Sequence, residues 1–212
     1  MSFSGKVKEE LSRQISTARH CQIAEIAAIL SVCGQVSISA NDHFCVTVHT
    51  ENVSVARKYF TLVEKTFNIE AVIHVRKNVY LKKSNVYRVE VPSHEDTVRI
   101  LQATKFMSPE QEIADDLSVM SRLVIQKECC KRAFLRGTFL AAGSISDPEK
   151  GYHLEIVCSR PLQAQQILEI LTEFEIEGRI VQRKKYYVVY IKEGAGISDF
   201  LNVVEAHVAL ME

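Results

Sequence analysis

Cysteine and histidine are the residue types in this chain with the widest chemistry, because they bind metals, transfer protons and form disulfides. The 212 residues include six cysteines and seven histidines. No two cysteines form a Cys-x-x-Cys pair and the histidines show no ligand spacing, so zinc-ribbon and thioredoxin patterns are missing. No glycine-rich, phosphate-cradling loop is present either. We therefore predict no metal site and no cofactor, and we expect buried, reduced thiols, as in cytoplasmic proteins.

The charge balance limits the classes of partner. Lys and Arg number 26, as do Asp and Glu, so the formal net charge is zero. This balance argues against strong nonspecific nucleic-acid binding by the chain as a whole, but it allows a local basic face. No apolar run approaches the length of a membrane span and the N-terminus is polar, so we expect no membrane partner.

Two apolar segments with helical spacing each stop at a glycine, a residue that commonly ends helices. They cover residues 26–34 and 135–143, so the two glycines lie 109 residues apart. Small residues recur on one face of each segment, which lets two helix backbones approach closely. We predict that the following residues form an interface between the helices: Ala24, Ala28, Ser31, Ala133, Gly137 and Ala141.

The elements around these helices repeat. In the first half we predict a helix over about 21–33, strands at 36–39 and 44–48, a helix opening at 50–52, strands near 71–75 and 86–91, and a helix over 93–105. In the second half we predict a helix over about 127–143, strands around 145 and at 153–158, a helix from 161, strands at 178–182 and 186–191, and a helix from 198. Each half is thus αββαββα, and the fold class is α+β.

This order divides the chain into an N-terminal helical segment (1–20), a first repeat (21–106), an acidic linker (107–127) and a second repeat (128–212). The last helix shows no glycine or proline stop, so we expect the chain to be cut from something longer.

The paired motifs resemble the LAGLIDADG fold of homing endonucleases, with 26–34 and 135–143 lying over the two nine-residue motifs. More narrowly, the chain is similar to the WhiA regulators of Gram-positive bacteria. That similarity is carried by residues 128–137 (ECCKRAFLRG), 143–154 (GSISDPEKGYHL), the opening MSFS with VKEEL at 7–11, and NVYR at 85–88. The resemblance implies a monomeric LAGLIDADG-like fold, in which two pseudo-symmetric repeats form saddle-shaped antiparallel sheets with helices behind.

In active members of the LAGLIDADG family the eighth motif residue is acidic, and the two carboxylates hold Mg²⁺ beside the scissile phosphate. The matching residues here are Cys33 and Ala142. A thiol is a poor Mg²⁺ ligand and a methyl group is none. Asp42 and Asp147 are nearby in sequence, but they fall where turns favour aspartate. We therefore predict a degenerate endonuclease fold that is not an enzyme, and an active endonuclease remains a distant alternative.

Basic residues gather at the hairpins of both repeats, where their twofold placement suits phosphate contacts on two half-sites. The candidate DNA-binding residues are Arg76, Lys77, Lys82, Lys83, Arg88, Arg183, Lys184, Lys185 and Lys192. Strand alternation places Arg88 and the second-repeat residues Tyr186, Val188, Tyr190 and Lys192 on the outer faces of the sheets. The alternatives are that lysine-rich hairpin tips aid solubility and block edge pairing, and that the tyrosines belong to the core.

The resemblance implies a cytoplasmic, nucleoid-associated regulator of transcription linked to sporulation or cell division. It also implies that a helix-turn-helix domain, absent from this chain, does much of the binding to double-stranded DNA. We expect the present part to assist DNA recognition. The main alternative is a module that binds a regulatory protein and leaves DNA to the missing domain.

Overall fold

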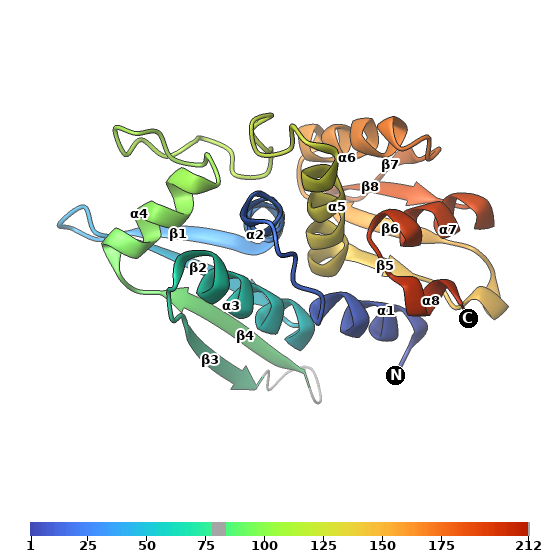
Figure 1. Ribbon diagram of the computed structural model, residues 1–212, viewed down its shortest axis with the longest axis horizontal. Helices are drawn as coiled ribbons and strands as arrows, with labels where there is room; N and C mark the ends of the chain where they lie inside the picture. The colour runs from blue at the N-terminus through green and yellow to red at the C-terminus, as the bar shows by residue number, and fades with distance from the viewer. Residues whose placement is uncertain (78–83, 212) are drawn as a thin grey trace.

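The computed structural model describes residues 1–77 and 84–211, and its helices and strands follow the predicted repeat (Figure 1). The first repeat consists of α2 (Arg19–Cys33), β1 (Gly34–Ile38), β2 (Phe44–Thr50), α3 (Val53–Phe67), β3 (Val72–Lys77), β4 (Asn85–Val91) and α4 (His94–Ala103). The second consists of α5 (Glu128–Ala142), β5 (Gly143–Ile145), β6 (Leu154–Cys158), α6 (Pro161–Glu173), β7 (Arg179–Arg183), β8 (Tyr186–Ile191) and α7 (Gly194–Val203). Helix α1 (Phe3–Ser12) precedes them, α8 (His207–Leu210) follows, and a single 3₁₀ turn covers Pro148–Lys150. The predicted αββαββα repeats are confirmed.

Each repeat contributes one antiparallel sheet of four strands. The strand order is β1-β2-β4-β3 in the first sheet and β5-β6-β8-β7 in the second, so the two topologies are the same. In Figure 1 the sheets lie to the left and right of the two central helices α2 and α5. The chain is therefore an α+β protein with internal pseudo-twofold symmetry.

Alternation along the strands separates an inner, helix-covered face from an outer face. Val46, Val48, Val89 and Val91 point inward and are at most 1% exposed. Helices α3 and α4 pack on this inner face of the first sheet, and α6 packs on the second sheet in the equivalent place. Because side chains in a strand alternate between faces, Arg88 must point away from the helices, as predicted.

The glycines that end α2 and α5 are required for a different reason from the one expected. Gly34 has φ −86° and Gly143 has φ −92°, so both are extended and neither is a left-handed cap. A Cβ on Gly34 would lie 2.6 Å from the Leu30 carbonyl oxygen, and one on Gly143 would lie 2.2 Å from the Phe139 ring. Glycine is needed because the chain turns from helix directly into strand without room for a side chain.

The final helix predicted from Ser198 to the chain end is wrong in its bounds. Helix α7 begins at Gly194 and ends at Val203, and the short α8 is separate. Glu205 adopts a left-handed conformation, with φ 67°, and the Ala206 N–H donates to the Leu201 carbonyl oxygen at 2.8 Å. This backbone arrangement stops a helix without a glycine, so composition alone did not reveal it.

Within residues 1–77 and 84–211, every helix is too short or too polar to cross a lipid bilayer.

Candidate nucleic-acid interface

Helices α2 and α5 are in direct backbone contact at Gly137. A Cβ on this glycine would lie 2.9 Å from the Ala28 Cβ and 2.9 Å from the Glu25 carbonyl oxygen. Any larger residue would force the helices apart. This glycine therefore fixes the separation of the two repeats.

The other small residues predicted for this interface lie along the same pair of helices. Ala24, Ala28 and Ala133 are completely buried. The Ser31 hydroxyl donates to the Ala28 carbonyl oxygen at 2.6 Å, and the Gln163 side chain donates to the Ser31 carbonyl oxygen. Ala141, near the end of α5, is only half-buried.

Cys33 and Ala142, the residues that the sequence resemblance matches to the eighth position of the LAGLIDADG motif, are the last residues of α2 and α5. Burial raises the pKa of the Cys33 thiol to about 12, and the thiol donates to the Ile29 carbonyl oxygen at 3.3 Å. A protonated thiol and a methyl group do not fit Mg²⁺, which requires hard oxygen ligands. This donor set offers no support for a metal-dependent hydrolysis step.

The two aspartates nearby in sequence serve turns. Asp42 adopts φ 53° between β1 and β2. The Asp147 carboxylate accepts a hydrogen bond from the Glu149 N–H at 3.0 Å and caps the 3₁₀ turn. Each aspartate thus has the local role that its turn position predicts.

The basic residues described in the first repeat lie on β3 and β4. Arg76 and Lys77 are exposed at the end of the edge strand β3. Arg88 points outward from β4, where its guanidinium lies 3.7 Å from the Glu90 carboxylate. Lys82 and Lys83 lie outside the described residues.

In the second repeat the basic residues surround the β7–β8 turn and the end of β8. Lys184 and Lys185 form the turn itself and are exposed. Lys185 and Lys192 each lie 5.3 Å from the centroid of a tyrosine ring, Tyr186 and Tyr190 respectively. These tyrosines lie on the outer face, because they pair with Arg183 and Arg179 across the strands. The interpretation of them as core residues is therefore wrong.

Strand register makes Arg76 and Arg183 equivalent positions of the two repeats. Ile73 pairs with Val89 in the first sheet, and Ile180 pairs with Val189 in the second. Each arginine lies three residues beyond its isoleucine on the edge strand, so both point outward near the ends of these strands. The pseudo-twofold axis thus relates two outward guanidinium groups.

A carboxylate engages the second of these arginines. The Glu155 carboxylate lies 2.7 Å from Arg183 and 3.0 Å from His153. Partial burial favours a higher pKa for Glu155, but the hydrogen bonds from His153 and Arg183 outweigh it and lower the pKa. Glu155 therefore stays ionised and orients the arginine on the outer face.

A shallow hollow lies beside this pair on the outer face of the second sheet. Its volume is about 300 Å³, and Val181, Val188 and Tyr190 form its apolar part. Val188 is 1% exposed although it points outward, and it lies between Val157 on β6 and Val181 on β7. The outer face of the second sheet is thus more apolar than a surface built only for phosphate contacts.

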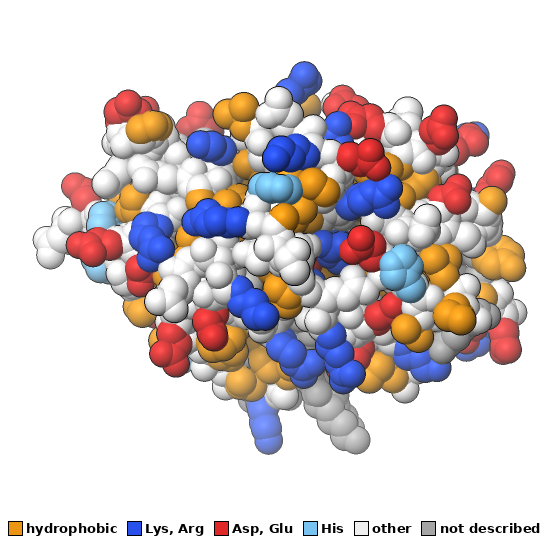
Figure 2. Space-filling model, in the orientation of Figure 1, with side chains coloured by type: hydrophobic (Ala, Val, Ile, Leu, Met, Phe, Trp, Pro, Cys, Tyr) orange, Lys and Arg blue, Asp and Glu red, His pale blue; other side chains and the backbone are white. Residues whose placement is uncertain are grey.

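Charges of both signs are interspersed on the side of the molecule shown in Figure 2, where Lys and Arg side chains lie among Asp and Glu side chains. This agrees with the zero net charge. Any attraction to DNA must come from local groups.

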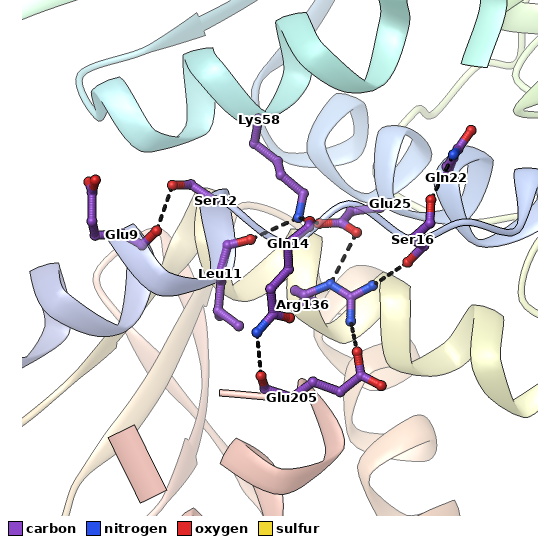
Figure 3. A network of polar contacts seen from close by, with 10 residues as sticks. All are labelled: Glu9, Leu11, Ser12, Gln14, Ser16, Gln22, Glu25, Lys58, Arg136 and Glu205. Atoms are coloured by element: carbon purple, nitrogen blue, oxygen red, sulfur yellow. Dashed lines mark hydrogen bonds and ion pairs between the residues drawn. The ribbon is translucent and has the colours of Figure 1, made fainter. Parts of the chain in front are cut away.

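A buried ionic cluster that the sequence did not reveal joins the two repeats (Figure 3). The Glu25 carboxylate lies 2.8 Å from the Lys58 Nζ and accepts from the Arg136 Nε at 3.1 Å. Arg136 also donates to the Ser16 Oγ at 3.0 Å and to the Glu205 carboxylate at 3.3 Å. Glu25 and Lys58 are completely buried, and Arg136 is 3% exposed. In the sequence, the cluster is visible only as three charged residues, Glu25, Lys58 and Arg136, that lie within apolar helical segments.

With two αββαββα repeats joined through glycine-terminated helices, the chain is a protein of the LAGLIDADG-like class. Solved structures share this fold. Full-length WhiA from Thermatoga maritima superposes with a TM-score of 0.71 at 20% identity over all of this chain and 66% of that one. The homing endonuclease I-DmoI, solved with DNA and Mn, gives a TM-score of 0.60 at 13% identity over 92% of this chain and 99% of that one.

Family models match both repeats: the WhiA N-terminal LAGLIDADG-like domain at residues 19–107 and the WhiA LAGLIDADG-like domain at residues 131–212. The chain is 51% identical over its whole length to a probable cell division protein WhiA of Lachnoclostridium phytofermentans, and 40% identical to one of Desulforamulus reducens. It covers 67% and 65% of these relatives, about two thirds of their length. The chain belongs to the WhiA family.

Proposed function

We propose that this chain is the part of a WhiA-type regulator that assists recognition of double-stranded DNA through the outer faces of its two sheets. The observation that carries the proposal is the symmetry-related pair Arg76 and Arg183, each pointing outward near the end of its edge strand. Two guanidinium groups related by a twofold axis match the symmetry of the phosphate backbones of a duplex. Arg88 and the lysines of the β7–β8 turn would extend the contacts, whereas Lys77 follows Arg76 on β3 and points to the opposite face of the sheet.

The same chain binds DNA without cleaving it. Cys33 and Ala142 supply no oxygen ligands at the ends of α2 and α5, and the Cys33 thiol is already hydrogen-bonded within its helix. The likeness to endonucleases therefore concerns the fold and not the reaction.

The biological role follows from the family. Relatives carry the name probable cell division protein, and they are longer than this chain. We place the protein in the cytoplasm on nucleoid DNA, as a regulator of genes for cell division or sporulation. A helix-turn-helix domain in the remaining third would supply most of the affinity.

The test is the salt dependence of duplex binding, measured by fluorescence anisotropy with this chain and with the full-length protein. Arg76→Ala combined with Arg183→Ala should weaken binding and make the slope of log K against log salt shallower by about 2, because each arginine–phosphate pair contributes about 1 to that slope. Lys65→Ala, on the helix side in α3, is the matched control and should leave the slope unchanged. Absence of duplex binding by this chain at low salt would contradict the proposal. Mg²⁺-dependent cleavage by purified protein would contradict the non-enzymatic part.

The hollow on the second sheet favours one other function. Val181, Val188 and Tyr190 form an amphipathic patch of the kind found at protein interfaces. If the chain binds no DNA, a regulatory protein partner on this face is the alternative. Tyr190→Ala should then weaken that complex, while the arginine variants should not.

A further inference from the structure

The N-terminal ends of α2 and α5 bring four metal-binding side chains into one cluster. His20 and Cys21 occupy the first turn of α2, and Cys129 and Cys130 occupy the first turn of α5. Their ligand atoms all lie within 4.8 Å of one another. The cluster lies at the opposite ends of these helices from Cys33 and Ala142, so it is separate from the endonuclease metal position.

The separations fit tetrahedral coordination. The His20 Nδ1 lies 3.4 Å from the Cys21 Sγ, 3.7 Å from the Cys129 Sγ and 3.3 Å from the Cys130 Sγ. With zinc–sulfur bonds of about 2.3 Å and zinc–nitrogen bonds of about 2.0 Å, the nitrogen–sulfur edge of a tetrahedron is about 3.5 Å. The three observed separations bracket that length.

Burial divides the cluster into a fixed half and an open half. Cys21 and Cys130 are 6% and 3% exposed, so packing between the helices holds them in place. His20 and Cys129 are exposed, which leaves a route for an ion to enter from solvent. Burial and the neighbouring thiols raise the pKa of Cys21 and Cys130, so an ion that binds here must displace their protons.

We propose that His20, Cys21, Cys129 and Cys130 bind one zinc ion that joins the two repeats. Three thiolates and one imidazole are a donor set typical of closed structural zinc sites. The pairs 20–21 and 129–130 lie 109 residues apart, the same interval that separates Gly34 and Gly143. The ligands are therefore symmetry-related positions, and a search for spacing within one segment could not find them.

Such an ion would clamp α2 to α5 at the ends that lie away from their glycines. Because the pair carries one sheet on each side, the clamp would fix the angle between the two outer faces. The proposal stands independently of DNA binding, and zinc binding can be measured without DNA.

The test uses the 212-residue chain, reduced and freed of metal with a chelator, then titrated with zinc against a chromophoric competitor. We expect one zinc per chain, a higher melting temperature with zinc, and cobalt substitution that gives the visible bands of a tetrahedral thiolate site. Cys129→Ser and Cys130→Ser should each weaken zinc binding by more than about 100-fold, beyond the effect of losing an outer-shell partner. Cys45→Ser, at a half-buried cysteine on β2, is the matched control and should bind zinc as the wild type does.

Three results would overturn the proposal. One is a reduced protein that takes up no stoichiometric zinc. Another is a Cys45→Ser variant that loses as much affinity as the cluster variants. The third is a protein that binds no zinc when reduced and forms a Cys21–Cys130 disulfide on mild oxidation. The cluster would then be a redox-active cysteine pair and not a metal site. If circular dichroism shows that Cys130→Ser does not fold, the zinc affinity of Cys129→Ser tests the proposal alone. Cys129 is exposed, so its substitution should leave the fold intact.

Discussion

At the scale of single residues, Gly137 determines how closely the two repeats approach. Its hydrogen atom occupies the place where a Cβ would meet Ala28 and the Glu25 carbonyl oxygen, each at 2.9 Å. The neighbouring atoms belong to a helix backbone and to a methyl group, which cannot rotate away. The small stripe is therefore a packing surface rather than a consequence of helix propensity.

Gly137→Ala should destabilise the protein. Alanine favours a helix over glycine by about 1 kcal/mol, but overpacking a tight contact costs about 1–3 kcal/mol, so we expect a net destabilisation of about 1 kcal/mol. Urea unfolding followed by circular dichroism measures the change. Gly194→Ala is the matched control, because a Cβ there would meet only Tyr152 at 3.4 Å, an ordinary contact. A Gly137→Ala variant as stable as the wild type would show that the helices can separate freely.

At the scale of elements, the β7–β8 hairpin combines a strained turn with a proposed binding role. Lys184 has φ 57°, a left-handed conformation that disfavours residues with a Cβ. Its position in a two-residue turn between Arg183 and Tyr186 makes this conformation necessary. A lysine in this strained conformation agrees with the proposed use of its charge in binding DNA.

Lys184→Gly should separate the backbone strain at this position from the contribution of the lysine charge to DNA binding. Glycine adopts positive φ without steric cost, so the free energy of unfolding of the variant should exceed that of the wild type by about 1 kcal/mol. The same substitution removes a charge and should weaken duplex binding at low salt. Thermal unfolding and anisotropy on one preparation give both quantities. Greater stability with unchanged DNA affinity would remove Lys184 from the proposed interface.

At the scale of the whole molecule, the ionic cluster around Glu25 connects α2, α3, α5 and the segment after α7 (Figure 3). Glu25 is the shared partner of two buried cations, Lys58 and Arg136. Burial lowers the pKa of Lys58, and the attraction of Glu25 offsets this only in part. The cluster therefore links the two repeats, and Glu25 is its one completely buried carboxylate, whereas Glu205 pairs with Arg136 from a more exposed position.

Glu25→Gln should leave the buried Lys58 without a charged partner and Arg136 with only the partly exposed Glu205, and it should destabilise the protein by about 3–5 kcal/mol. Glu128→Gln, which breaks the exposed pair with Arg132, is the matched control and should cost less than about 1 kcal/mol.

The effect of Glu25→Gln should also depend on pH, because the pKa of Lys58 is lower in the folded protein than in the unfolded chain. At pH values between these two pKa values the unfolded chain binds more protons than the folded protein, so the contribution of Lys58 to stability rises with pH in that range. The defect of Glu25→Gln should thus diminish in alkaline buffer. Equal destabilisation by the two substitutions at neutral pH would show that the cluster does not join the repeats.

The sequence by itself determined the αββαββα repeat, the pairing of α2 with α5 and the identities of Cys33 and Ala142. These follow from local signals: helical and strand periodicity, turn residues, and an interval between two glycines that both halves share. The bounds of α7 could not be predicted in this way, because a left-handed Glu205, and no glycine, follows the end of that helix.

Only the tertiary structure decided which distant side chains meet. Glu25 and Arg136, or Cys21 and Cys130, lie about as far apart in sequence as the two repeats do, and no periodicity within either segment links them. They come together because Gly137 lets α2 and α5 touch along their length. Contacts across that interface depend on the packing angle of two helices, which the pattern of each helix alone does not contain.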